Sequence, residues 1–81
     1  MRKQVKLTPP TVREFVQALN ADPNKDMWHF ENESGDDIVN ARSLLGSIWA
    51  MDYWDVVYIV NDTHPGEYCD FMYKYFSEKG E

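Results

Sequence analysis

The longest uninterrupted apolar run in this chain covers only residues 56–60, with three valines, one isoleucine and Tyr58. β-Branched and aromatic residues favour an extended strand. The run is far too short to cross a bilayer, which takes about 20 apolar residues. A chain of 81 residues has the size of one domain. We therefore expect residues 1–81 to form a single small core around this strand.

Two segments have the periodicity of amphipathic helices. The first follows two prolines and begins near Thr11, which has capping-box spacing with Glu14. Its apolar positions recur on one helical face, at Val12, Phe15, Val16 and Leu19. The second is expected after Ser43, a residue type that caps helices. Its broad apolar stripe consists of Leu44, Leu45, Ile48 and Trp49.

The remaining segments complete an α+β pattern. Further strands are expected at residues 4–7, 27–31 and 37–40, with a hairpin turn at residues 32–36 and another turn at residues 52–55. A third helix is expected at residues 67–79, with Tyr68, Met72, Tyr75 and Phe76 on one face. The order β-α-β-β-α-β-α predicts a four-stranded antiparallel sheet with three helices on one face.

Charge and cysteine usage exclude several function classes. The formal net charge is −6, which disfavours nucleic acids and anionic membrane surfaces, because both require clustered Lys and Arg. Cys69 is the only cysteine, so no internal disulfide can form and a reducing compartment is expected. The basic start of the chain lacks the apolar stretch of a signal peptide. These features predict a cytoplasmic protein.

The residues that could carry chemistry are few and scattered. His29, His64 and Cys69 have no metal-ligand spacing, and Cys69 is better explained by packing beside Met72 and Phe76. The four glycines form no phosphate-binding loop. We expect no metal, no cofactor and no enzymatic activity.

One segment is more specific. Residues 39–46 read Val-Asn-Ala-Arg-Ser-Leu-Leu-Gly. This segment resembles the start of the second helix in HPr, the histidine-containing phosphocarrier protein of the bacterial sugar phosphotransferase system. Residues 14–18 and 56–59 are similar to the first helix and fourth strand of that family. The resemblance implies an open-faced β-sandwich with strand order 1-4-2-3 beneath three helices.

The phosphoryl-transfer loop of HPr is where this chain departs from the family. HPr carries its phosphoryl group on a histidine in a Gly-Leu-His-x-Arg-Pro loop that caps the first helix. Counting back from Phe15, Thr8 stands at the histidine position and Pro10 at the arginine position. His29 lies within a strand and His64 is expected at the opposite end of the sheet, so neither replaces the lost histidine. We therefore expect no phosphocarrier activity.

Ser43 is retained, and the resemblance gives it two interpretations. In some bacteria the equivalent serine of HPr is phosphorylated by a regulatory kinase, and the aliphatic residues after it contact a transcriptional regulator. Ser43 is thus a candidate phosphorylation site, with Arg42, Leu44 and Leu45 as the flanking partner surface. The simpler interpretation is that Ser43 only caps the helix.

These observations predict a non-phosphocarrier, HPr-like domain that acts by protein–protein binding, in regulation of the phosphotransferase system or of carbon metabolism. The alternatives are an unconventional phosphotransfer protein and a structural subunit of a larger assembly. Residues 56–60 are apolar on both faces, and Tyr53 and Trp54 lie in the turn before them. Because exposed apolar surface usually marks an interface, we expect a homodimer or an obligate partner, bound either through the open sheet face with Tyr58 or through the aromatic end with Tyr53 and Trp54.

Overall fold

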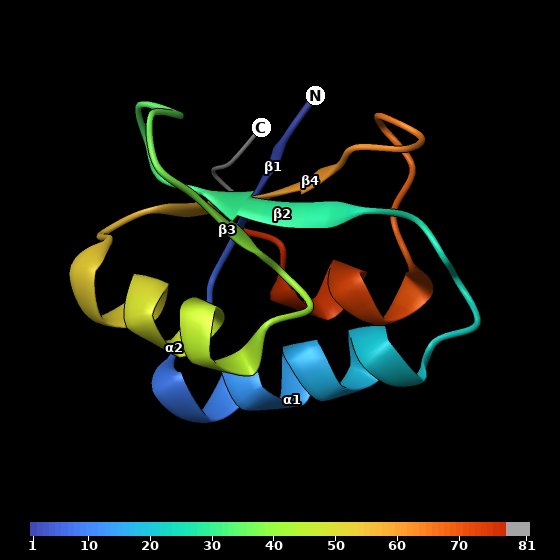
Figure 1. Ribbon diagram of the computed structural model, residues 1–81, viewed down its shortest axis with the longest axis horizontal. Coiled ribbons are helices and arrows are strands. Elements are labelled where there is room, and N and C mark those ends of the chain that lie inside the picture. Colours follow the sequence, from blue (N-terminus) through green and yellow to red (C-terminus); the bar gives the residue numbers. More distant parts are fainter. Residues whose placement is uncertain (78–81) are drawn as a thin grey trace.

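A computed structural model describes residues 1–77 (Figure 1). It contains strand β1 (Lys3–Val5), helix α1 (Pro9–Ala21), strands β2 (Trp28–Glu31) and β3 (Ile38–Asn40), helix α2 (Leu44–Tyr53), strand β4 (Val57–Asn61) and a 3₁₀-helix, η1 (Asp70–Tyr75). The sheet is antiparallel, in the order β1-β4-β2-β3. The predicted α+β class, the antiparallel strand order and the β-α-β-β-α-β order of the first six elements are therefore confirmed.

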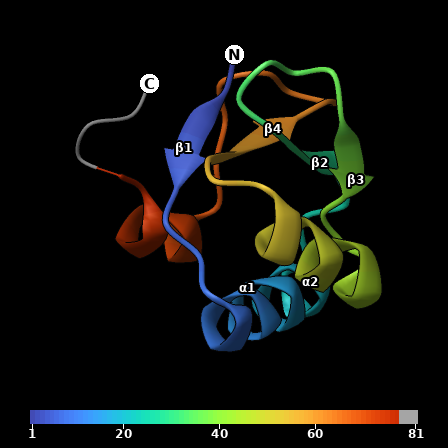
Figure 2. The same ribbon diagram turned by 90° about the vertical axis from the view of Figure 1, so that its left-hand side faces the viewer.

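The molecule has two layers, a sheet and a helical layer on one side of it (Figures 1 and 2). The core lies between the layers. Phe15 of α1 is its centre, with its ring 5.4 Å from Phe30 of β2, 5.2 Å from Phe71 and 5.3 Å from Tyr75. The predicted inward positions of α1 are all buried, at Val12, Phe15, Val16 and Leu19. The other face of the sheet carries no helix in Figures 1 and 2, which makes it the open face.

Helix α1 begins earlier than the capping-box spacing of Thr11 and Glu14 suggests. Thr8 is the N-cap, and Pro9 and Pro10 occupy the first helical positions, where a missing N–H costs nothing. The Thr8 hydroxyl accepts a hydrogen bond from Thr11 N–H, and the Thr11 hydroxyl accepts one from Thr8 N–H. Thr11 is thus the third residue of the helix, and the capping box is built from two threonines.

Strand and turn boundaries also differ from expectation. The first strand ends at Val5, and the N–H of the next residue, Lys6, donates to Tyr75 C=O on the side away from β4. The fourth strand continues to Asn61, whose buried side chain donates to Asp26 and to Glu67 C=O. Residues 52–53 belong to α2 and not to a turn, and Trp54 is the C-cap.

The expected third helix at residues 67–79 is wrong in type and length. Only residues 70–75 are helical, as a 3₁₀-helix without a side-chain cap. The chain then becomes extended at Phe76, which forms a bridge with Val5, and Ser77 N–H donates to Gln4 C=O. This pairing with β1 ends the helix. Residues 78–79 lie outside the described residues.

Candidate functional site

The candidate site is the outward side of α2, and its geometry begins at Ser43. The Ser43 hydroxyl accepts a hydrogen bond of 3.2 Å from Gly46 N–H, which satisfies one free donor of the first helical turn. Gly46 leaves room for this contact, since a Cβ there would lie 3.3 Å from Ser43 Oγ. The predicted capping role of Ser43 is confirmed. Ser43 is also exposed, so it is accessible to modification.

Arg42, expected on the partner surface, is used inside the domain. Its guanidinium donates to three main-chain carbonyls where α1 ends and the chain turns toward β2. These bonds reach Leu19 at 3.1 Å, Asn24 at 2.9 Å and Asp26 at 3.0 Å. Arg42 therefore ties the start of α2 to the end of α1, and its charge faces carbonyl oxygens.

The other residues of the 39–46 segment also have structural roles, with one exception. Asn40 accepts hydrogen bonds from the N–H groups of Arg42 and Ser43, at 2.9 and 3.0 Å. Ala41 is buried, and Val39 and Leu44 pack against the core. Leu45 has no such role, because 82% of its surface is exposed.

Leu45 begins an apolar stripe along α2. Trp49 and Tyr53 follow it at intervals of four residues, which places all three on one side of the helix. Trp49 is 47% exposed and Tyr53 is 70% exposed. The Trp49 ring lies 5.0 Å from Tyr53 and 6.1 Å from Trp54. We call Leu45, Trp49 and Tyr53 the α2 stripe.

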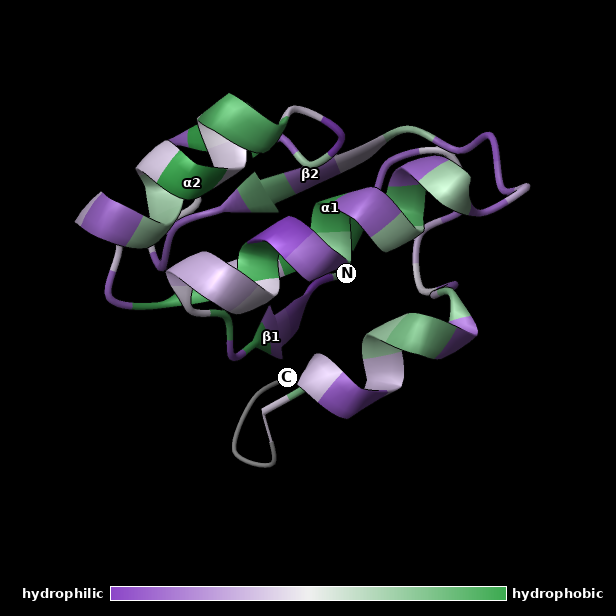
Figure 3. Cartoon of the chain, turned by 90° about the horizontal axis from the view of Figure 1, so that it is seen from below, coloured by the Kyte–Doolittle hydropathy of each residue, from purple (hydrophilic) through white to green (hydrophobic). Residues whose placement is uncertain are grey.

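The stripe exists because α2 is apolar on nearly every side. Ser47 and Ala50 are buried on the inner side, and Ile48 and Met51 pack at the margin of the core. In Figure 3, α2 carries more hydrophobic colour than α1, where polar and apolar residues alternate. A helix that is hydrophobic all round is normally buried. The sequence places Trp49 in the apolar stripe of α2 but does not identify it as a site residue. The signal that could have identified it is that α2 has more apolar residues than one buried face needs.

Tyr58, another expected contact residue, is covered by a side chain of the same domain. It lies on the open face of the sheet but is only 8% exposed. The Arg2 guanidinium stacks on its ring at 3.8 Å and pairs with Glu31 at 2.9 Å. Trp54 is half-buried at the end of α2. Of the expected aromatic contact residues, Tyr53 presents the most surface.

A chain of charged groups extends from Arg2 and Glu31 across the open face. His29 bonds Glu31 through Nε2 at 2.9 Å and Asp62 through Nδ1 at 2.8 Å. Partial burial lowers the pKa of His29, but the bonds to Asp62 and Glu31 outweigh it and the net shift is upward. For Glu31, burial raises the pKa, and the bonds from His29 and Arg2 bring it below its ordinary value. Both shifts favour the charged forms, so the network stabilises a protonated His29 next to an ionised Glu31.

Thr8, expected from the resemblance at the position of the HPr histidine, follows the end of β1. Thr8 lies there with Lys6, Thr11 and Asp55 around a surface pocket of about 440 Å³, and no histidine lines it. His64 hydrogen-bonds Asp26 at 2.9 Å, in the loop region after β4. That hydrogen bond raises the pKa of His64. The structure thus brings neither His29 nor His64 to the lining of the Thr8 pocket.

Within residues 1–77, no group of three His, Cys, Asp or Glu side chains converges as a metal site. Cys69 is buried, and burial raises the pKa of its thiol to about 11, so the reactive thiolate is scarce at neutral pH. No helix in the described part of the chain has the length and hydrophobicity to span a membrane.

Comparisons with known proteins find no matching family model, no similar curated protein and no similar solved structure.

Proposed function

We propose that this chain is an HPr-like domain without phosphoryl transfer, and that it acts by binding a partner protein through the α2 stripe. The observation that carries the proposal is Leu45. Its neighbours in residues 39–46 cap, tie or pack α2, whereas Leu45 points its side chain to solvent in line with Trp49 and Tyr53. Clustered apolar and aromatic side chains on a surface are typical of interfaces.

The charges beside the stripe indicate the chemistry of the partner. Asp52 and Asp55 are exposed at the C-terminal end of α2, and the positive charge of Arg42 is directed at carbonyl groups inside the domain. A complementary surface has an apolar groove for Leu45 and Trp49 and basic residues at its rim. We therefore propose a partner with a basic rim.

A second copy of the chain fits this surface less well. Each copy carries a formal charge of −6, and α2 contains no Lys or Arg that could face Asp52 and Asp55 of a second copy. Like charges at an interface cost binding energy. The proposal is therefore a heterologous partner, and a homodimer is the result that would contradict it.

Ser43 is the proposed point of regulation. Its hydroxyl is exposed at the N-terminus of α2, two residues before Leu45. A phosphate there would add about −2 charge next to the stripe, and the positive end of the helix dipole would tolerate it. Modification would then change which partner binds while α2 stays folded.

The test begins with a photo-crosslinking amino acid in place of Trp49, in cells that express the chain. The matched control carries the same amino acid in place of Gln17, which is exposed on α1. The protein that crosslinks at position 49 and not at position 17 is then purified and titrated with wild type and with Leu45→Ser. We expect Leu45→Ser to weaken binding by at least roughly tenfold.

Three results would contradict the proposal. The first is a crosslink to a second copy of the chain. The second is equal binding of wild type and Leu45→Ser to the purified partner. The third is phosphoryl transfer: incubation with phosphoenolpyruvate and the first enzyme of the phosphotransferase system should leave the mass of the chain unchanged. An acid-labile phosphate on His29 or His64 would show an unconventional carrier.

A further inference from the structure

The two edge strands of the sheet differ in whether another segment pairs with their outer side. At the β1 edge, the end of η1 and the residues after it cover the strand: Lys6 N–H donates to Tyr75 C=O, and Ser77 N–H donates to Gln4 C=O. At the other edge, β3 pairs with β2 and with no other strand among residues 1–77. Figure 2 shows β3 at the outer side of the sheet, with α2 below it. Strand β3 is therefore the free edge.

The free edge presents unused main-chain groups. Asn32 N–H donates to Asp37 C=O and Ala41 N–H donates to Trp28 C=O, so residues 37, 39 and 41 direct their main chain toward β2. Ile38 and Asn40 direct theirs outward. Asn40 C=O is used by Ser43 N–H. Within residues 1–77, no partner occupies the main-chain N–H or C=O of Ile38.

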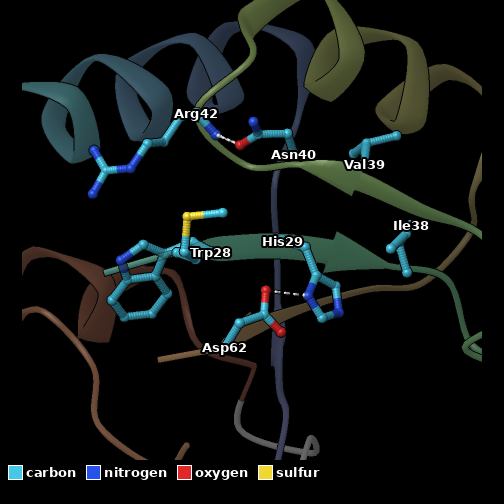
Figure 4. Close-up of a pocket in the computed structure, with 8 residues that line it drawn as sticks. Trp28, His29, Ile38, Val39, Asn40, Arg42 and Asp62 are labelled. Carbon is cyan, nitrogen blue, oxygen red and sulfur yellow. Dashed lines mark hydrogen bonds and ion pairs between the residues drawn. The ribbon is translucent and has the colours of Figure 1, made fainter. Parts of the chain in front are cut away.

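A pocket of about 340 Å³ lies beside this edge (Figure 4). Ile38 and Met27, which are 60% and 67% exposed, supply much of its apolar lining. The hydrogen-bonded pair of His29 and Asp62 forms a polar side. A side chain on the open face of an added strand would project next to Ile38, within reach of this pocket.

Exposed acidic side chains flank the edge, and Arg2, which reaches Glu31 opposite Ile38, is paired with that carboxylate. Asp36 and Asp37 are exposed immediately before β3, and Asp62 is exposed beside the pocket. Arg42, the first cation after β3, is hydrogen-bonded to the carbonyls of Asn24 and Asp26. An occupant with positive charge would therefore be complementary.

We infer that β3 is a docking edge for an extended segment of a partner protein in which apolar residues alternate with Lys or Arg. The segment adds a fifth strand through Ile38 N–H and C=O, as in β-augmentation. An apolar side chain enters the pocket of Ile38 and Met27, and the basic residues face Asp36 and Asp37. This edge is separate from the α2 stripe, so it is tested independently of the proposed function.

The probe is a short, blocked peptide of alternating lysine and valine, titrated into the ¹⁵N-labelled full chain and followed by NMR. We expect saturable shifts at the amides of Ile38, Val39 and Asn40, with those of Leu45 and Trp49 unchanged. A matched peptide of alternating glutamate and valine should not bind. A third peptide, with N-methylated valines, lacks the donors for a ladder and should also fail.

Variants of the chain separate main-chain pairing from charge. Ile38→Pro removes an N–H that no group inside the domain uses, and proline is tolerated at such edge positions. It should weaken the lysine–valine peptide roughly tenfold, whereas Ile38→Val should bind like wild type. Asp36→Lys should also weaken it, and Asp52→Lys, the same charge change on α2, should not. These two charge variants decide the question if Ile38→Pro fails to fold.

Several results would overturn the inference: no saturable shifts with the lysine–valine peptide, shifts centred on α2, or equal binding of the glutamate–valine peptide. Equal effects of Asp36→Lys and Asp52→Lys would reduce the interaction to net charge. Concentration-dependent shifts at β3 without peptide would show that a second copy of the chain occupies the edge.

Discussion

The guanidinium carbon of Arg2 lies 3.8 Å from the centre of the Tyr58 ring. The same guanidinium pairs with Glu31 of β2 at 2.9 Å, so it bridges two neighbouring strands on the open face. This contact explains how β4 can be apolar on both faces without exposing Tyr58. Tyr58 is thus covered by Arg2 of the same chain, whereas the sequence suggests that a partner covers it.

We predict that Arg2→Ala lowers the free energy of unfolding by about 1 kcal/mol, because it loses the ring contact and a partly exposed ion pair. Arg2→Lys should lose less, since it keeps the charge but not the flat stacking. Urea unfolding measures both. Arg13→Ala, which removes an exposed arginine on α1, is the control and should change little. Equal effects of Arg2→Ala and Arg13→Ala would contradict the prediction.

The His29 network predicts a pH dependence of stability. The pKa of His29 is raised above its ordinary value of 6.5, so its contribution is present below that pH and is lost as the pH rises through the folded-state value. The pKa of Glu31 is lowered from 4.5, so its contribution is present above that pH and is lost in acid. Stability should decline on both sides of a mildly acidic maximum.

Urea unfolding between about pH 5 and pH 8 checks the upper limb of this profile. His29→Gln should flatten it, because glutamine cannot take up the proton. His64→Gln should remove a second contribution to stability that is also lost as the pH rises, since Asp26 raises the pKa of His64 as well. An unchanged slope in His29→Gln would show that the network carries no pH-dependent stability.

Ser47 offers a stabilising substitution. Its hydroxyl is fully buried on the inner side of α2 and has no hydrogen-bond partner among residues 1–77. A buried, unpaired hydroxyl costs about 1 to 3 kcal/mol. Ser47→Ala removes the hydroxyl at little cost in packing and also raises helix propensity. We expect the urea midpoint to rise with an unchanged slope; a fall would mean that the hydroxyl makes a bond in solution.

Local patterns explain what could be predicted. The spacing of Val12, Phe15 and Leu19 allows only one buried helical face, and the β-branched residues after Asp55 favour a strand. The capping role of Ser43 could be predicted because it depends only on the residues directly after it. The order of these elements predicts an antiparallel sheet with helices on one face, whereas the strand order 1-4-2-3 came from the resemblance to HPr.

Contacts between distant residues explain what could not be predicted. The last helix is short because Phe76 leaves it to pair with Val5, about 70 residues earlier in the chain. Arg42 looked like a surface cation and instead binds carbonyls of residues 19–26. The polar side of the pocket beside β3 forms where Asp62, directly after β4, hydrogen-bonds His29 of the neighbouring strand β2. No local pattern encodes these pairings.

The last prediction separates the two roles of Ser43. Ser43→Ala should lower the free energy of unfolding by about 0.5 to 2 kcal/mol, because Gly46 N–H loses its acceptor. Ser43→Asp should restore the cap and add a negative charge that interacts favourably with the N-terminus of α2.

If Ser43 is also a regulatory site, an HPr-type kinase should label wild type and not Ser43→Ala. The Ser43→Asp variant should then stay folded while binding the α2 partner differently. If Ser43→Asp regains stability but neither kinase nor partner distinguishes the variants, Ser43 is a cap alone. A Ser43→Ala variant as stable as wild type would instead remove the capping role, because the 3.2 Å bond to Gly46 would then contribute nothing.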